Sequence, residues 1–364
     1  MKRWTAAMLV AVACQYCAMT LQHDASANAA APVVAPAPAP TSAPSAIARA
    51  LERYESVRSR VEAELGVTEA AVLHGRLFDD LELQAAPPPE GYSAADWADT
   101  VASTLNLDIE AVDQLVSGIP APLRATPGLH EVLVPSRVDK RWQLVAVYVP
   151  TSLKPGKAPL AIALHGNPET ESHLLGMPYL RRLADRTGTI VVAPFGRGIY
   201  DYEEPAATDV YDLLRAVQDA FPIDRGRTYL VGYSMGGFSV FKIGPRGGYR
   251  WSAAMCISGA ILNSGVRAVS IAWQTLRIYV VTGANDDSVP TKFGEQTAAY
   301  LASAGLPVSF YEEPKGTHFI RSLTPSLQRA WDDMHASLVR GENVPVARAG
   351  FSLPGSAPAG VQHP

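Results

Sequence analysis

The chain has 364 residues, of which 48% are hydrophobic and 18% charged, enough apolar material for roughly two domains with buried cores. Its 31 Lys and Arg are outnumbered by 35 Asp and Glu, giving a formal net charge of −4, so we expect no nucleic-acid partner. The 28 glycines and 29 prolines follow no fixed period, which excludes a collagen-like fibre.

The first residues follow the order of a secretory signal peptide. Lys2 and Arg3 precede an apolar run over residues 4–19, and small residues at 25–27 and 27–29 fit A-x-A cleavage sites. We therefore expect residues 1–27 to be a signal peptide and the protein to be exported, to the periplasm or outside the cell. The apolar run is shorter than the ~20 residues of a membrane span, so we expect no stable span after the signal is removed.

The cysteines follow from this prediction. Cys14 and Cys17 have C-x-x-C spacing but lie inside the predicted signal, so only Cys256 remains in the mature chain. The mature protein then has no internal disulfide and depends on its hydrophobic core. A lipoprotein anchored at Cys14 is the alternative, and it is disfavoured because Ala11 stands where such a signal has a large aliphatic residue.

A linker and a helical region come next. Residues 28–44 form an Ala/Pro tract typical of an extended linker, and residues 45–126 have a helical pattern. Apolar residues recur there at three- and four-residue steps and stop at Gly66: Leu51, Tyr54, Val57, Val61 and Leu65. A second helix is predicted from an N-cap at Ser93, and a third over residues 108–116, ended by Gly118. This region carries no recognisable chemistry.

Residues 127–340 alternate between strands and helices. Strand-like runs occupy residues 131–138, 142–150, 160–164, 189–193, 228–232, 253–258, 277–282 and 307–311, and helix-length segments separate them from the third run onward. This order predicts an α/β domain with a mostly parallel sheet flanked by helices. The first two runs are joined by a short polar stretch and predict an antiparallel hairpin at the sheet edge. Residues 341–364 are rich in Gly, Pro, Ser and Ala and are expected to form a loose tail.

A G-x-S-x-G pentapeptide is centred on Ser234, with Tyr233 before the serine and Met235 after it. A strand-like run over residues 228–231 leads into it and a helical run over residues 235–243 follows. That context is required of a nucleophile turn, because the serine must be lifted clear of the sheet and the glycines let the backbones approach closely.

An acid and a base follow in the order that such a serine needs. Asp286 lies in the loop after the run at 278–282, and His318 lies in the loop after the run at 308–311. Loops at the carboxyl ends of strands are where open α/β sheets place their sites. We predict that Ser234, Asp286 and His318 act together as nucleophile, orienting acid and general base.

These motifs resemble the α/β-hydrolase superfamily, and most of all its serine-esterase and prolyl-oligopeptidase-like branch, which includes dienelactone-hydrolase-like and polyester-depolymerase-like members. The resemblance covers residues 160–331 and rests on the stretches ALHGNPE, GRTYLVGYSMGG, GANDDSVP and KGTHF. It implies an α/β-hydrolase sheet and a serine hydrolase that needs no cofactor. The family's spacing of the acid selects Asp286 over Asp287.

Two backbone donors are predicted to stabilise the oxyanion. Met235 follows the nucleophile and supplies one N–H. The other is expected from the loop after residues 160–164, where Pro168 has no N–H and Asn167 is the better candidate. His165 in the same loop is expected to be structural.

Four further residues are candidates for contact with substrate. Phe195 and Arg197 follow the run at 189–193, whereas Tyr233 and Phe319 flank two of the predicted catalytic residues. Core packing of the aromatic rings and a solvated arginine are the alternative explanations.

The sequence therefore predicts an exported serine hydrolase for carboxylic esters, with a small-molecule or polymeric ester as substrate. It contains no H-E-x-x-H motif and, outside the predicted signal, no zinc-like His/Cys spacing, so we expect no metal. A peptidase is the nearest alternative, because the same three residues cleave amides. The residues before the sheet are too few for the propeller domain that oligopeptidases of this branch carry, which favours an esterase. A binding protein that keeps the fold without turnover is the third alternative.

Overall fold

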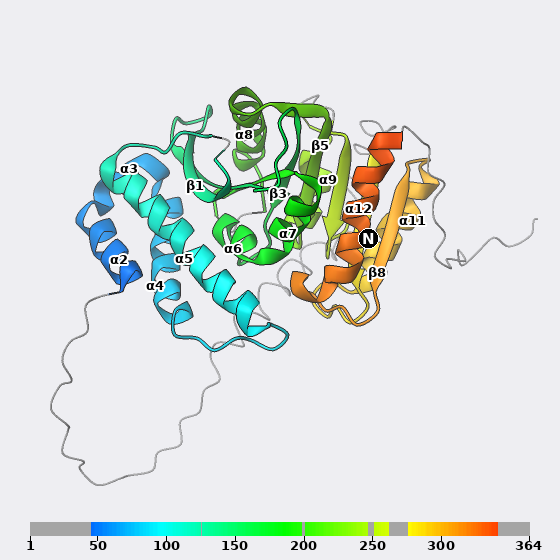
Figure 1. The fold of residues 1–364 in the computed structure, drawn as a ribbon, viewed down its shortest axis with the longest axis horizontal. Coiled ribbons are helices and arrows are strands. Elements are labelled where there is room, and N and C mark those ends of the chain that lie inside the picture. The colour runs from blue at the N-terminus through cyan, green and yellow to red at the C-terminus, as the bar shows by residue number, and fades with distance from the viewer. Residues whose placement is uncertain (1–44, 125, 199–200, 247–250, 262–275, 341–364) are drawn as a thin grey trace, which may run out of the picture. The chain divides into compact units, whose positions relative to one another are not determined.

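The computed structural model describes residues 45–340, apart from residues 125, 199–200, 247–250 and 262–275. Its centre is an eight-stranded sheet with the order β1-β2-β4-β3-β5-β6-β7-β8, and helices lie on both sides of it (Figure 1). The strands are β1 (Gly128–Pro135), β2 (Trp142–Val149), β3 (Ala158–Leu164), β4 (Ile190–Pro194), β5 (Ile223–Tyr233), β6 (Ala253–Ile257), β7 (Arg277–Gly283) and β8 (Val308–Glu313).

The pairing of the strands confirms the predicted α/β fold. β2 is antiparallel to both β1 and β4, whereas every pair from β4 across the sheet to β8 is parallel. Each of the eight predicted runs corresponds to one strand, and the first two form the expected hairpin at the edge. Parallel strands end at the same edge of the sheet, so the loops that follow β3, β5, β7 and β8 meet there.

Alternation along the strands builds two cores. Successive strand residues point to opposite faces, so Leu230 packs in one cluster, and Tyr229 and Val231 pack in the other. The first face is covered by α8 (Ala206–Ala220), α9 (Met235–Ile243) and α11 (Thr291–Ser303). The second is covered by α6 (Glu171–Gly176), α7 (Pro178–Thr187), the short helix η1 (Ile320–Leu323) and α12 (Thr324–Arg340).

The helical region precedes the sheet and comprises α2 (Ala46–Ser56), α3 (Arg58–Leu65), α4 (Val67–Leu83) and α5 (Ala94–Ser117). The hydroxyl of Ser93 accepts a hydrogen bond from the N–H of Asp96 and caps α5, as predicted. The predicted second and third helices are a single helix, however, because no glycine or proline interrupts the chain before Gly118, whose φ of 68° ends α5.

A third hydrophobic cluster joins this region to the sheet. Leu73 and Leu115 from the helices pack in it with Leu133 of β1 and Leu144 of β2. The described residues from Ser45 to Arg340 accordingly belong to one compact unit. The predicted boundary between the helical region and the α/β domain, after residue 126, therefore rests on the sequence pattern alone. The signal peptide, linker and tail predicted over residues 1–27, 28–44 and 341–364 lie outside the described residues.

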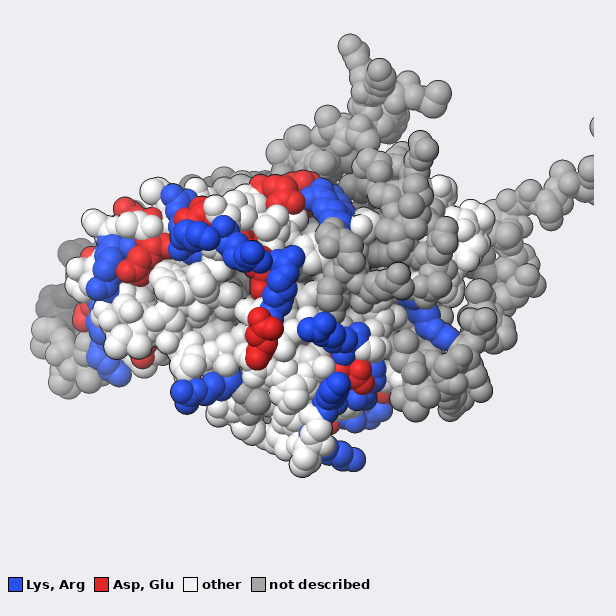
Figure 2. All heavy atoms as spheres, turned by 90° about the horizontal axis from the view of Figure 1, so that it is seen from above, with Lys and Arg blue, Asp and Glu red and all other residues white. Residues whose placement is uncertain are grey.

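The surface carries charges of both signs. On the face in Figure 2, basic and acidic side chains are interspersed. Among the described residues, no helix combines the length and the apolar character needed to cross a membrane.

Candidate active site

Ser234 occupies a sharp turn between β5 and α9. Its φ of 52° and ψ of −115° are sparsely populated by residues other than glycine, as a strained nucleophile turn requires. A Cβ at Gly232 would lie 2.1 Å from the carbonyl oxygen of Gly236, and one at Gly236 would lie 2.2 Å from that of Leu164. Both positions therefore accept only glycine, and the predicted strand–turn–helix arrangement is present.

A hydrogen-bonded series connects the three predicted residues. The hydroxyl of Ser234 lies 2.9 Å from Nε2 of His318, and Nδ1 of His318 lies 2.9 Å and 3.0 Å from the two carboxylate oxygens of Asp286. His318 and Asp286 are buried, whereas Asp287 is exposed and accepts a hydrogen bond from the hydroxyl of Ser288. The structure thus brings the serine, the histidine and the first of the two aspartates together.

The carboxylate of Asp286 is held by the backbone of its own loop. Its Oδ1 accepts hydrogen bonds from the N–H groups of Ser288 (3.0 Å) and Val289 (2.7 Å). Because these donors fix the carboxylate, it can hold the imidazole of His318 in one orientation and one tautomer.

Tyr233 lies against the histidine. Its side chain is 4% exposed, its hydroxyl donates to the carbonyl oxygen of His318 (3.0 Å), and its ring centroid is 5.6 Å from that of the imidazole. The ring supports the loop that carries His318, which agrees with the packing explanation for this residue.

The loop after β3 lies directly against the nucleophile turn. The N–H of Gly236 donates to the carbonyl oxygen of His165 (3.0 Å), and a Cβ at Gly166 would lie 3.1 Å from the Cβ of Ser234. Met235 begins α9, where the first N–H groups have no partner within the helix. Asn167 is exposed and follows Gly166. The two segments predicted to supply oxyanion donors therefore flank the serine.

His165 is fully buried. Its ring nitrogens lie 2.8 Å from the carbonyl oxygen of Gly166 and 3.0 Å from that of Phe195. Burial lowers the pKa of His165, which favours the neutral ring. These contacts tie two loops together and agree with the structural role expected for this histidine.

Phe195 and Arg197 are both buried by contacts within the protein. Phe195 is 1% exposed and packs in the cluster formed with the helical region. The guanidinium of Arg197 is 2.6 Å from Asp139 and 2.7 Å from Asp209 and also donates to Ser136. These contacts agree with the alternatives of core packing for Phe195 and, for Arg197, with an ion-paired arginine instead of a solvated one.

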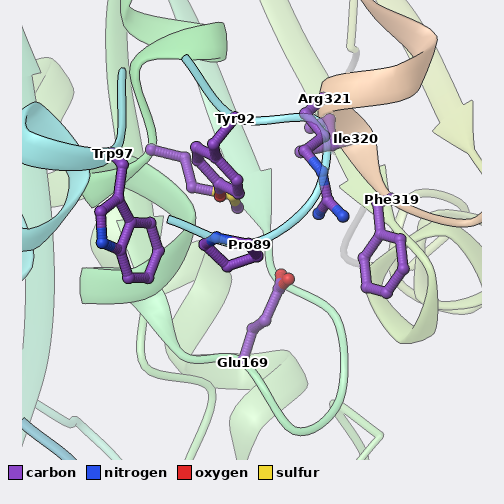
Figure 3. A pocket seen from close by; sticks show the side chains of 8 residues that line it. Pro89, Tyr92, Trp97, Glu169, Phe319, Ile320 and Arg321 are labelled. Atoms are coloured by element: carbon purple, nitrogen blue, oxygen red, sulfur yellow. The ribbon is translucent and has the colours of Figure 1, made fainter. Parts of the chain in front are cut away.

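A pocket of about 250 Å³ adjoins the histidine loop (Figure 3). It is lined by Pro89, Tyr92, Trp97, Glu169, Met177, Phe319, Ile320 and Arg321. Of the four residues predicted to contact substrate, Phe319 alone lines this pocket. The helical region supplies one wall. The others come from the loop after β3, from Met177 between α6 and α7, and from the loop after β8 with the start of η1. Sequence reasoning missed the remaining lining residues. Of these, Glu169 ends the ALHGNPE stretch, and the others belong to no motif.

Two charged groups enter this pocket. Oε2 of Glu169 is buried and has no hydrogen-bond partner in the described part of the chain. Burial raises the pKa of Glu169 to about 7, and the charges of His318 and Arg321 partly oppose the shift. The raised pKa makes the protonated form of this carboxyl accessible near neutral pH.

Arg321 is held between two rings. Its guanidinium carbon lies 4.2 Å from the ring centroid of Phe319 and 5.1 Å from that of Tyr92, and its Nε donates to the carbonyl oxygen of Glu90 (3.1 Å). In Figure 3 the guanidinium and the carboxyl of Glu169 point toward the same space from opposite sides.

Among the residues described, no group of three or more His, Cys, Asp or Glu side chains is arranged to hold a metal ion.

The chain was also compared with known proteins. No family model matches the chain. Over 147 residues, 39% of this chain, it is 29% identical to a bifunctional acetylxylan esterase/xylanase of Neocallimastix patriciarum, and the match spans about a fifth (21%) of that relative's length.

Solved structures with a similar fold include a ferulic acid esterase of Anaeromyces mucronatus (16% identity, 58% of this chain and 92% of that one, TM-score 0.48). They also include an S-formylglutathione hydrolase from Agrobacterium tumefaciens (16% identity, 58% of this chain and 97% of that one, TM-score 0.47). A puromycin-hydrolysing peptidase of Mycobacterium tuberculosis is similar as well (16% identity, 60% of this chain and 40% of that one, TM-score 0.48). With its mostly parallel sheet, its Gly-x-Ser-x-Gly turn after β5, and an aspartate and a histidine in the loops after β7 and β8, the chain has the α/β-hydrolase fold.

Proposed function

We propose that this protein is a serine hydrolase that cleaves carboxylic esters through an acyl-enzyme. Ser234 is the nucleophile, His318 the general base and Asp286 the residue that orients the base. The observation that carries the proposal is the continuous series from the Ser234 hydroxyl through both imidazole nitrogens to the Asp286 carboxylate. Nucleophile and base lie within the reach that proton transfer requires.

In the proposed reaction, Nε2 of His318 takes the proton of Ser234 as its oxygen attacks the ester carbonyl. The N–H groups of Met235 and Asn167 stabilise the oxyanion of the tetrahedral intermediate, and each such donor is worth about 3 kcal/mol in the transition state. The imidazolium then gives its proton to the departing alcohol, which leaves an acyl group on Ser234. Water, deprotonated by the same histidine, attacks this acyl group and regenerates the serine.

The choice of ester over amide is supported by the match to the acetylxylan esterase/xylanase. We infer a small-molecule or polymeric ester as substrate, no requirement for a cofactor, and export directed by the signal-like residues at 1–27.

The test compares wild type with Ser234→Ala on p-nitrophenyl esters from acetyl to long acyl chains, and on a panel of aminoacyl nitroanilides. Turnover of esters that disappears in the variant, with unchanged thermal unfolding, is the expected result. A fluorophosphonate probe should label wild type and not the variant. Turnover of anilides alone would replace the proposal with a peptidase, and ester turnover by Ser234→Ala would refute the mechanism.

A further inference from the structure

We propose that the pocket beside the histidine loop binds a carboxylate on the non-reacting half of the ester. The preferred substrates would then be esters with a flat ring that ends in a carboxylate, such as half-esters of an aromatic dicarboxylic acid. This inference rests on the proposed function and adds its substrate class.

Arg321 supplies the positive charge in a fixed position. The ring faces of Phe319 and Tyr92 hold the guanidinium, at 4.2 Å and 5.1 Å from the ring centroids to its carbon. Its Nε is engaged by the carbonyl oxygen of Glu90, while the terminal nitrogens point into the pocket (Figure 3). A guanidinium held in this way binds a carboxylate with little loss of side-chain freedom.

Glu169 faces Arg321 and can supply a second donor. Its buried Oε2 lacks a partner among the described residues. The charged and titratable groups that act on it are His318, Arg321 and the hydroxyl of Tyr92. Burial raises the pKa of Glu169 to about 7, so the protonated carboxyl is accessible near neutrality and can donate to an anionic oxygen. Arg321 and protonated Glu169 together would satisfy a ligand carboxylate.

The shape of the pocket favours a ring. Trp97, Tyr92 and Phe319 contribute aromatic walls, and the volume of about 250 Å³ exceeds the about 150 Å³ of a cavity known to hold benzene. The pocket is also within reach of the serine. Gly166 and His318 both lie against Ser234. Glu169 follows Gly166 by three residues, so their Cα atoms are at most about 11 Å apart, and the same limit holds for Arg321 and His318.

The experiment uses matched pairs of probes that differ only in charge. Monomethyl terephthalate and methyl 4-carbamoylbenzoate place the group on the acyl half, and 4-(acetoxymethyl)benzoate and its carboxamide place it on the alcohol half. We expect kcat/KM to favour the carboxylate in one pair by about tenfold or more, and that pair identifies the half that enters the pocket. A kcat/KM for the carboxylate probe that is no higher than that for the carboxamide probe, in both pairs, would overturn the proposal. Because p-nitrophenyl acetate is assayed alongside, loss of all ester turnover would instead refute the proposed function.

Variants assign the preference to the pocket. Arg321→Gln should reduce the carboxylate-to-carboxamide ratio about tenfold, and Arg321→Lys should restore part of it. Arg137→Gln is the matched control, because Arg137 does not line the pocket and its side chain is 68% exposed. An unchanged ratio in folded Arg321→Gln, or an equal loss in the control, would overturn the proposal.

The pH dependence tests the role of Glu169. Its ionisation beside a bound carboxylate is unfavourable, so KM for the carboxylate probe should rise above pH 7 while KM for the carboxamide does not. Glu169→Gln should remove this rise. A KM for the carboxylate probe that falls on ionisation would show that the carboxyl of Glu169 accepts from a hydroxyl or ammonium instead, which contradicts the proposal.

Discussion

The hydroxyl of Tyr233 donates a 3.0 Å hydrogen bond to the carbonyl oxygen of His318, so the residue that precedes the serine holds the loop that carries the histidine. The imidazole also lies against the tyrosine ring. One residue at the end of β5 therefore links the turn that carries the serine to the loop that carries the histidine.

Tyr233→Phe should have a larger effect on kcat, expressed as a free energy, than on the free energy of unfolding. It removes one buried hydrogen bond, worth about 1 kcal/mol of unfolding free energy, and it frees the histidine loop, for which we expect about a tenfold loss of kcat. Ester kinetics and urea unfolding measure the two effects. Tyr229→Phe is the control: its buried hydroxyl has no partner among the described residues, so activity should stay and stability should hold or rise. Equal activity in both variants would contradict the positioning role.

Asp286→Asn should reduce kcat by about four orders of magnitude, because an amide cannot stabilise the imidazolium and selects the wrong tautomer. Asp287→Asn should change kcat less than threefold, since that carboxylate is exposed and does not contact His318. Single-turnover kinetics with a p-nitrophenyl ester compare the two variants. If Asp287→Asn were the more damaging change, the assignment of the acid would be wrong.

Arg76→Met should destabilise the fold by about 3–5 kcal/mol. Arg76 of α4 pairs with Asp108 of α5 and with Glu171 of α6 (2.7 Å), and all three side chains are buried. Its removal leaves two buried carboxylates without their cation.

Arg53→Met is the matched control for Arg76→Met. Arg53 pairs with Asp113, but both side chains are about half exposed, so we expect a change of about 0.5 kcal/mol or less. Denaturant unfolding of both variants tests the contrast, and similar losses would show that burial of the Arg76 network contributes nothing specific.

Asp80 should make stability fall as pH rises. Burial raises its pKa from 3.8 to about 7, and both of its oxygens lack partners among the described residues. The folded state therefore binds more protons than the unfolded state between about pH 4 and 7. The contribution of protonated Asp80 to the unfolding free energy is complete below pH 4 and is lost as the pH rises to about 7. His173 and His335, whose pKa values are lowered by burial to about 4, act in the opposite direction in part of this range.

The measurement is therefore a difference. The unfolding free energy of Asp80→Asn relative to wild type should increase between pH 4 and 8, because only wild type is destabilised by the ionisation of Asp80. The histidine contributions are the same in both proteins and cancel. A difference that is constant across this range would show that Asp80 does not titrate with a raised pKa.

Patterns that are local in the chain were sufficient for the fold. Alternation, the glycines around Ser234, and loops that follow buried strands act over a few residues, and the chain order of the strands sets the order in which Ser234, Asp286 and His318 appear. The glycines are required by contacts within the turn itself and with the neighbouring strand. The sequence by itself therefore determined the α/β sheet, the position of the strained turn and the residues that meet beside it.

Contacts between distant segments were decided only by the tertiary structure. Arg321 meets the carbonyl oxygen of Glu90 across 231 positions of sequence, and Arg197 meets Asp139 across 58. No periodicity encodes such pairs, because an arginine or an aromatic ring in a loop is compatible with solvent, an ion pair or a pocket wall. Which of these it adopts depends on the groups that burial places beside it. For this reason the three residues of the proposed triad could be read from the sequence, whereas the walls and charges of the pocket, and hence the inferred substrate class, could not.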